Sequence, residues 1–503
     1  MRRTNYWFCK TVFDFSNPSK FITERIVDKP VNFINGVFLT PAGSPVITVE
    51  DPCTHNIIGE IPNCGSSQTL EAINVAESAF KKWKNVMPRE RAFILHKWAD
   101  LILHHKESLA NILSRESGKV VSEGMGECLY AERFIEWYAG EAERVYGDII
   151  PGPRKDVLTM VLRQPVGVVA VITPWNFPSA MITRAVAGAI AAGCTVVLKP
   201  SELTPFSALA LAQLATEAGV PEGVFNIITG DAPPIGETLL DSFNVRKISF
   251  TGSTRVGKYL YKRSASTMKK LSLELGGNAP FIIFEDADLE KALNGLINAK
   301  FRSAGQACIS SNRIFVHTSI YDTFLKMLIE KVKTLRVGNS FDKSVNIGAL
   351  INNNAIKRLE TMVEDAVLKG AKVEIGGKRI NGPGYFFEPT ILSCVDHDSM
   401  KCCQEEIFGP LIPILKFTDT TEVIEAANST PAGLAAYIYT QDYRKQLNVS
   451  EQLQFGMIGV NDSGLSSPCA PFGGIKESGL GRDGSKYGID AFVDIKYVLQ
   501  SRE

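Results

Sequence analysis

The hydrophobic positions in the first third of the chain follow the period of an α-helix. Apolar residues recur at helical spacing in residues 70–80 and again in residues 93–103, which places them on one face of a helix. The same pattern extends over residues 67–147. We therefore expect this part of the chain to form a series of helices.

From residue 166 onward, short apolar blocks without polar alternation are separated by helical segments. Strands of this kind are buried on both faces, and strands that alternate with helices pair in parallel. A second region of the same type runs from residue 281 to residue 474. The pattern predicts an α/β fold with two such domains. The blocks in the first region are residues 166–172, 195–198, 224–228 and 247–250.

The end of the chain has a different pattern. Residues 489–499 alternate between apolar and polar side chains, which predicts an edge strand. Because a long exposed edge usually needs a partner strand, we expect a homodimer or a homotetramer.

The most apolar stretch, residues 185–198, is interrupted by Gly193. It is shorter than the roughly 20 residues of a membrane-spanning helix, so we interpret it as a buried helix, a glycine stop and a buried strand. The 54 basic and 54 acidic side chains balance. This leaves no overall charge to attract nucleic acid or an anionic membrane, and neither partner is expected.

The ten cysteines are scattered without the spacing of a disulfide framework. This is typical of a reducing compartment, and we expect a cytoplasmic protein. Basic residues near the start of the chain leave a mitochondrial presequence in residues 1–25 as the alternative. The histidines and cysteines form no metal-binding motif, so no metal is expected.

Two residues are candidates for covalent chemistry. Cys308 lies in the small, polar segment 301–309, where a turn would leave its sulfur accessible as a nucleophile. Glu274 lies between two leucines, and a carboxylate in apolar surroundings has an adjustable pKa that suits a general base. Considered alone, a cysteine is more often a small buried hydrophobic residue. The other motifs of the chain must therefore decide whether Cys308 is a structural residue or a nucleophile.

Three predicted strands end in polar turns, at the edge where parallel sheets bind ligands. Asn176 follows the first strand, and its amide could stabilise an oxyanion or belong to an ordinary turn. Lys199 and Glu202 follow the second and could bind ribose hydroxyls or form a surface ion pair. Gly252 and Ser253 open a helix, which suits a phosphate, although no Gly-x-Gly-x-x-Gly fingerprint is present.

Seven motifs together resemble the aldehyde dehydrogenase superfamily in order and spacing over nearly the whole chain. The resemblance implies a Rossmann-like NAD-binding domain (residues 1–145 and 167–278) and an α/β catalytic domain (residues 279–474). It also implies a small β element for oligomerisation (residues 146–166 and 475–503). The motifs are residues 174–178 (PWNFP), 199–202 (KPSE), 250–254 (FTGST), 273–277 (LELGG), 305–308 (GQAC), 406–410 (EIFGP) and 471–476 (PFGGIK).

This resemblance also implies roles for the candidate residues. Cys308 would attack an aldehyde, Asn176 would stabilise the alkoxide, and Glu274 would activate the water that hydrolyses the thioester. A carboxylate at Glu202 would repel a 2′-phosphate, so we expect NAD as the preferred cofactor and NADP as the alternative. The implied cofactor contacts are Thr173, Pro174, Trp175, Lys199, Ser201, Glu202, Gly230, Gly252, Ser253, Glu406 and Phe408.

Within the superfamily, residues 176–184, 300–306 and 478–490 resemble the succinate-semialdehyde dehydrogenases. Arg184, Arg302 and Ser466 then match positions that bind the substrate's carboxylate, and guanidinium groups suit that partner. Without the family, either arginine could serve a structural ion pair. Ser310 stands where some relatives carry a second cysteine, so a disulfide between that position and Cys308 is excluded.

Two alternatives remain open. The first is a glutarate-semialdehyde or broader ω-carboxy aldehyde dehydrogenase, because one methylene group discriminates by only about 1–3 kcal/mol. The second is a non-catalytic structural protein of the same fold.

Overall fold

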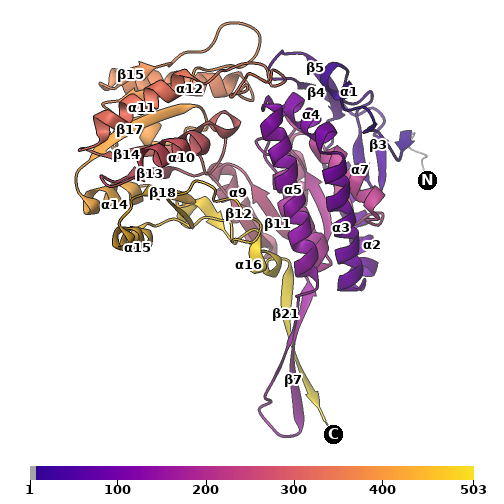
Figure 1. Ribbon diagram of the computed structural model, residues 1–503. Coiled ribbons are helices and arrows are strands. Elements are labelled where there is room, and N and C mark those ends of the chain that lie inside the picture. The colour runs from indigo at the N-terminus through magenta and orange to yellow at the C-terminus, as the bar shows by residue number, and fades with distance from the viewer. Residues whose placement is uncertain (1–6, 503) are drawn as a thin grey trace.

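The largest sheet of the protein is built mainly from the first 274 residues and gains one short strand from near the end of the chain (Figure 1). In the computed structural model, which describes residues 7–502, this sheet has nine strands in the order β1-β3-β2-β10-β9-β8-β11-β12-β20. The strands are β1 Trp7–Cys9, β2 Asn32–Ile34, β3 Val37–Thr40, β8 Val168–Ile172, β9 Thr195–Lys199, β10 Phe225–Ile227, β11 Val245–Thr251, β12 Lys270–Glu274 and β20 Gly479–Leu480.

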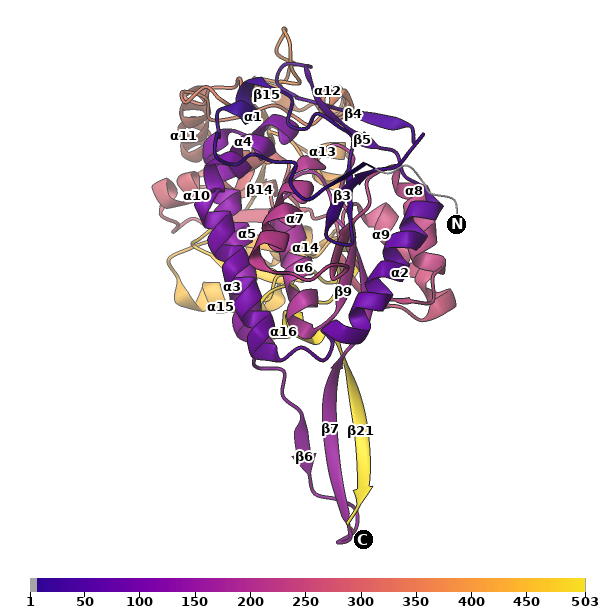
Figure 2. The same ribbon diagram turned by 90° about the vertical axis from the view of Figure 1, so that its right-hand side faces the viewer.

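The expected parallel strands are confirmed, and their apolar composition has a direct cause. Neighbouring residues of a strand point to opposite faces, so Val169 and Val171 of β8 pack into one hydrophobic cluster, while Val168 and Ala170 pack into another. Helices cover both faces of the sheet (Figure 2). One face carries α2 Ser66–Trp83, α8 Ala232–Asp241 and α9 Thr254–Ser264, and the other carries α3 Pro88–His104, α5 Val121–Ala142, α6 Ala180–Ala192 and α7 Phe206–Ala218.

Helices occupy most of residues 67–147, as the hydrophobic period predicted. The remaining helix of this region is α4 Lys106–Ser117. The apolar stretch 185–198 divides at Gly193, which has a φ of 94° and ends α6 before β9 begins. Within residues 7–502, none of the helices combines the length and the apolar character that crossing a membrane would require.

A second sheet carries the later part of the chain. Within the described residues it has seven strands in the order β15-β16-β17-β14-β13-β18-β19, and its own hydrophobic core is separate from that of the first sheet. The strands are β13 Ala279–Ile283, β14 Ser311–His317, β15 Lys372–Ile375, β16 Thr390–Ser393, β17 Leu411–Phe417, β18 Ala435–Tyr439 and β19 Met457–Val460. The helices are α10 Leu289–Phe301, α11 Tyr321–Lys333, α12 Asn353–Leu368, α13 Lys401–Gln404, α14 Thr420–Asn428 and α15 Tyr443–Gln452.

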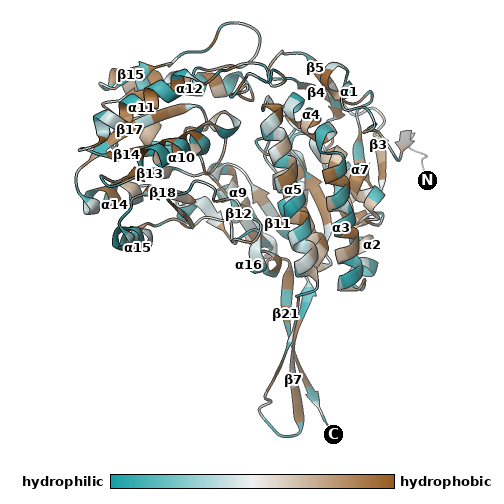
Figure 3. Cartoon of the chain, in the orientation of Figure 1, coloured by the Kyte–Doolittle hydropathy of each residue, from teal (hydrophilic) through white to brown (hydrophobic). Residues whose placement is uncertain are grey.

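A third sheet extends away from the rest of the molecule in both views (Figures 1 and 2). It contains β6 Asp148–Ile150, β7 Val157–Pro165 and β21 Val493–Ser501 in the order β21-β7-β6. The strands β21 and β7 pair over their whole lengths, and β21 is left at an edge. Ile149 and Ile495 are about three-quarters exposed, at 75% and 72%, and apolar residues are visible along these strands (Figure 3).

The C-terminal region differs from the prediction in two places. The edge strand expected over residues 489–499 begins only at Val493, because residues Ser485–Asp490 form helix α16 and Ile489 is buried in the main core. In addition, Leu480 of β20 pairs with Leu273 of β12. Residues 479–480 therefore lie in the nine-stranded sheet, although we had placed them in the β element of residues 475–503.

The N-terminal segment and the smaller elements complete the fold. Of the presequence considered for residues 1–25, residues 1–6 lie outside the described part. Phe13, Phe15 and Phe21 are buried in the main core, so cleavage as late as residue 25 would remove core side chains. The smaller elements are α1 Lys20–Thr23, the antiparallel pair β4 Val46–Glu50 and β5 Ile57–Pro62, and the 3-10 helices η1 Ala265–Thr267, η2 Arg302–Gly305 and η3 Lys476–Ser478.

Candidate active site

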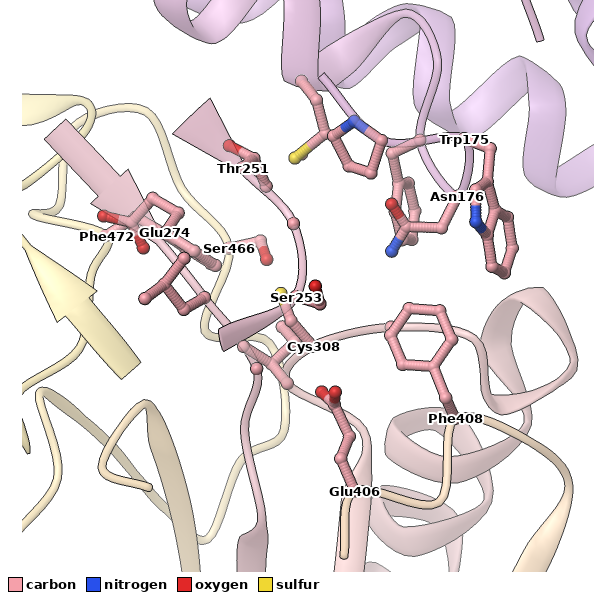
Figure 4. Close-up of a pocket in the computed structure, with 18 of the residues that line it drawn as sticks. Trp175, Asn176, Thr251, Ser253, Glu274, Cys308, Glu406, Phe408, Ser466 and Phe472 are labelled. Atoms are coloured by element: carbon pink, nitrogen blue, oxygen red, sulfur yellow. The ribbon is translucent and has the colours of Figure 1, made fainter. Parts of the chain in front are cut away.

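Most of the predicted site residues line one pocket, whose cavity volume is about 230 Å³. In Figure 4, Asn176 and Glu274 lie to either side of Cys308. The predicted residues that line the pocket are Pro174, Trp175, Asn176, Arg184, Gly252, Ser253, Glu274, Arg302, Cys308, Glu406, Phe408 and Ser466. The other five predicted residues, Thr173, Lys199, Ser201, Glu202 and Gly230, are not part of its lining.

A strained turn precedes Cys308, the predicted nucleophile. After α10, Ser303, Ala304 and Gly305 have φ values of 52°, 54° and 78°, and the left-handed conformation is costly for residues that have a Cβ atom. This turn leads to Cys308, which is partly exposed at the pocket, as expected. Burial raises the pKa of the Cys308 thiol to about 12, although Arg184 and Arg302 act in the opposite direction.

Asn176 connects the first sheet to this turn. It follows β8, is only 6% exposed, and its Nδ2 donates a hydrogen bond to the backbone oxygen of Gln306 at 3.0 Å. An amide nitrogen carries two hydrogens, so one N–H remains for a substrate oxygen.

Glu274 ends β12 and is buried in the pocket wall. Neither carboxylate oxygen has a hydrogen-bond partner in residues 7–502. Burial and the neighbouring Asp483 raise the pKa of Glu274 well above its usual value, and Arg184 opposes this shift. Gly277 allows the turn after β12 to approach Cys308, because a Cβ atom there would lie 2.3 Å from the backbone oxygen of Cys308.

The pocket also contains groups that fit a nicotinamide dinucleotide. Trp175 and Phe408 meet edge to face, with ring centroids 5.5 Å apart, and offer aromatic surface for a flat ring. Glu406 accepts a hydrogen bond from the backbone nitrogen of Gly277 at 2.9 Å. Burial raises the pKa of Glu406 to about 7. A Cβ atom at Gly276 would lie 2.9 Å from this carboxylate, so the glycine keeps the space around it open.

The cofactor candidates outside the pocket lie at the end of the first sheet. Lys199 Nζ and Glu202 Oε2 form an ion pair of 2.6 Å. Ser253, which does line the pocket, caps the start of α9 by accepting a hydrogen bond from the backbone nitrogen of Val256, and N–H groups at a helix start suit a phosphate. Gly230 has a φ of 141° and would bring a Cβ atom within 2.6 Å of the Cys64 backbone, so packing alone explains this glycine.

The two arginines differ in their surroundings. Arg184 is 1% exposed, its Nε lies 2.8 Å from Asp483 Oδ2, and its guanidinium lies over the Phe472 ring at 4.3 Å. Arg302 is exposed, lies over the Phe177 ring at 5.0 Å, and forms no ion pair within the described residues. Arg302 therefore carries the less compensated charge.

Several pocket residues were not predicted. Tyr130 of α5, Phe177 and Phe472 line the pocket, and Asp483 pairs with Arg184. Phe177, Phe472 and Asp483 lie inside sequence segments already singled out, so proximity to the motifs was an available signal. Tyr130 had no such signal, because its position depends on how α5 packs.

Comparisons with known proteins place the chain in a family. The model of the aldehyde dehydrogenase family matches residues 38–498. The mitochondrial succinate-semialdehyde dehydrogenase of Arabidopsis thaliana is 50% identical over 92% of this chain and 88% of its own length. The glutarate-semialdehyde dehydrogenase of Pseudomonas putida is 47% identical over 93% of this chain and 97% of its own length.

A solved structure extends the similarity to the fold. The crystal structure of an NADP-dependent enzyme from Escherichia coli superimposes with a TM-score of 0.93 at 46% identity. The match covers 98% of this chain and 100% of that chain. The fold and the sequence similarity define an NAD(P)-linked oxidoreductase. The chain belongs to the aldehyde dehydrogenase family.

Proposed function

We propose that this protein oxidises succinate semialdehyde to succinate with NAD or NADP as the cofactor. The observation that carries the proposal is a single pocket that combines Cys308 and Glu274 with the exposed guanidinium of Arg302. The first two residues supply the chemistry of an aldehyde oxidation, and the third suits a substrate with a carboxylate. The similarity to succinate-semialdehyde dehydrogenases over most of the chain supports the same substrate.

The first half of the reaction forms a bond between the Cys308 sulfur and the aldehyde carbon. The thiolate is the reactive form, and the negative charge moves to the aldehyde oxygen when the bond forms. The remaining N–H of Asn176 and the backbone N–H of Cys308 stabilise that charge. A nicotinamide bound beside Trp175 and Phe408 would serve as the hydride acceptor.

The second half of the reaction releases the acid. Glu274 takes a proton from a water molecule, which attacks the thioester carbon and frees the Cys308 sulfur. The raised pKa of Glu274 suits this role, because a stronger base accepts the proton more readily.

Substrate selection is attributed to the arginines and Ser466. Arg302 lies in the turn that carries Cys308, and Arg184 Nη2 is buried without a hydrogen-bond partner in the described chain. Both can donate to a carboxylate. Glutarate semialdehyde is the second candidate, because the Pseudomonas putida relative carries that name and one added methylene group discriminates by only about 1–3 kcal/mol.

We also propose that NAD is preferred over NADP. Glu202 is paired with Lys199, is 39% exposed on its side chain, and lies at the carboxyl end of β9. Its negative charge would accept hydrogen bonds from ribose hydroxyls and repel a 2′-phosphate. A kcat/KM with NADP that equals or exceeds the value with NAD would refute this preference.

The projecting sheet supports association into a homodimer or homotetramer. Its exposed apolar residues and the position of β21 at the edge of the sheet are features that a partner subunit would cover.

The function is tested by following formation of reduced cofactor with succinate semialdehyde, glutarate semialdehyde and butanal. We expect succinate semialdehyde to give the highest kcat/KM, and the Cys308→Ala variant to be inactive with all three. Equal kcat/KM values for the three aldehydes would refute recognition of the substrate's carboxylate. An active Cys308→Ala variant would overturn the mechanism.

A further inference from the structure

A second, smaller cavity shares Trp175 and Asn176 with the active-site pocket. Its lining also includes Lys119, Glu123 and Ser303. The space open to the centre of a water molecule is about 10 Å³, which is enough for one ordered water.

Two residues of this lining each have a buried polar side-chain atom without a protein partner. Asn176 Oδ1 and Ser303 Oγ belong to residues that are 6% and 4% exposed, and neither atom forms a hydrogen bond within residues 7–502. Buried polar atoms are nearly always paired, either with protein or with ordered water. These two unpaired atoms therefore indicate that the cavity binds a small polar molecule such as water.

Helix α5 binds two segments beside this cavity. The first is the nucleophile turn, residues 303–305 before Cys308, and the second is the oxyanion turn, residues 176–180, which begins with Asn176. Glu123 accepts hydrogen bonds from the backbone nitrogen of Ser303 at 3.0 and 3.1 Å. Glu127 accepts from the backbone nitrogens of Ser179 and Ala180 at 2.9 and 3.2 Å. Because residues four positions apart share one face of a helix, one face of α5 fixes the nucleophile turn and the oxyanion turn relative to each other.

Lys119 connects these groups. Its Nζ donates to Glu127, donates to the backbone oxygen of Asn176 at 2.9 Å, and lies over the Phe177 ring at 3.8 Å. The side chains of Lys119 and Glu127 are 3% and 1% exposed, so this pair is shielded from solvent and geometrically fixed.

We propose that the small cavity is a binding site for one ordered water molecule, which donates to Asn176 Oδ1, and that Glu123 and Glu127 are positioning residues for the two turns. The proposal rests on the proposed function only in taking Asn176 as the oxyanion donor. The strained Ser303–Gly305 turn keeps its conformation because the Glu123 carboxylate binds its first N–H.

The water has a specific consequence for the Asn176 amide. With Oδ1 bound to the water and Nδ2 bound to Gln306, the remaining N–H of Nδ2 faces the pocket. A flipped amide would set its oxygen against the Gln306 carbonyl and against the developing alkoxide. The Gln306 backbone oxygen, which can only accept, thus selects the amide orientation that catalysis requires, and the water satisfies Oδ1 in that orientation.

A high-resolution crystal structure of the unmodified protein tests the water site. We expect a water within hydrogen-bond distance of both Asn176 Oδ1 and Ser303 Oγ. A structure that shows ordered waters elsewhere but none at this position would overturn the water site.

Kinetics of Glu123 variants test the positioning role. For Glu123→Ala we expect kcat to fall by about 10- to 100-fold, as small displacements of reacting groups do. The KM for the aldehyde and the rate of Cys308 alkylation by iodoacetamide should stay within about threefold of the parent, because neither depends on the alignment of the Cys308 sulfur with the Asn176 amide. Glu123→Gln keeps an acceptor for Ser303 and should recover most of kcat.

The matched control is Glu136→Ala, which removes an exposed carboxylate from the same helix and should leave kcat unchanged. An unchanged kcat in Glu123→Ala, or a parallel loss of alkylation and turnover, would overturn the positioning role. If the parent itself fails to oxidise aldehydes, the proposed function falls, while the crystal structure still decides the water site.

Discussion

The Cys308 thiol is surrounded by groups that act on its ionisation in opposite directions. Burial raises its pKa to about 12, and the guanidinium groups of Arg184 and Arg302 limit the rise. Without cofactor, the thiolate is therefore a small fraction of the thiol at neutral pH. The reactive species becomes more abundant as pH increases.

The rate of Cys308 alkylation should report this ionisation. Below its pKa the thiolate fraction grows about tenfold per pH unit, so the rate with iodoacetamide should rise steadily between pH 7 and pH 10 in the cofactor-free protein. The Cys308→Ala variant serves as the control, because Cys394 and Cys469 are also exposed. A plateau that begins near neutral pH would contradict the raised pKa.

Glu274 should control the second half-reaction alone. In Glu274→Gln we expect one rapid equivalent of reduced cofactor per site, followed by turnover reduced by about 10²- to 10⁴-fold, as measured by stopped flow. Because the pKa of Glu274 is raised, the base is protonated at low pH, and parent turnover should increase as pH rises through that pKa. Loss of the initial burst in the variant would show that Glu274 acts in a step before hydrolysis.

Arg184 has a structural partner that Arg302 lacks, so replacing the two arginines should change the free energy of unfolding by different amounts. Arg184→Ala leaves Asp483 buried without its counter-ion, and breaking a buried pair in this way costs about 3–5 kcal/mol. Arg302→Ala should change the free energy of unfolding by less than about 1 kcal/mol. Urea denaturation measures both, and equal losses would contradict the assignment.

At the scale of elements, a clear hydrophobic pattern was sufficient to predict a strand or a helix. A segment whose pattern fits both a strand and a helix was not predicted correctly. The β8 and β9 strands were predictable because burial on both faces gives continuous apolar blocks. The alternation over residues 489–499 hid the end of α16, because Ile489 packs into the core as part of a helix. The β20–β12 pairing joins residues more than 200 positions apart and has no local signature.

The β21 strand offers a test of association at the level of one element. Ile495 and Tyr497 are 72% and 60% exposed, and charges there would oppose burial in a subunit interface. We expect the parent to sediment as an oligomer and the Ile495→Asp/Tyr497→Asp variant to sediment as a smaller species. Lys496→Gln, on the other face of the strand, is the control. A parent that sediments as a monomer would contradict the proposal.

At the scale of the whole molecule, the active site depends on two separate cores meeting at one pocket. Motifs from the nine-stranded sheet supply Asn176 and Glu274, and the region of the seven-stranded sheet supplies Cys308. The motif order along the chain was enough to expect these three residues at one site, and they line one pocket. The supporting contacts were not predictable, because Glu123 with Ser303 and Arg184 with Asp483 form only when distant segments pack together.

The central claim is that the pocket oxidises an aldehyde that it recognises by its carboxylate. The most direct measurement is the ratio of kcat/KM for succinate semialdehyde to kcat/KM for butanal, in the parent and in Arg302→Ala. A charge-assisted hydrogen bond contributes about 1.5–3 kcal/mol, so we predict that the ratio falls by about 10- to 100-fold in the variant. Equal losses with both aldehydes, or no loss with either, would contradict the claim.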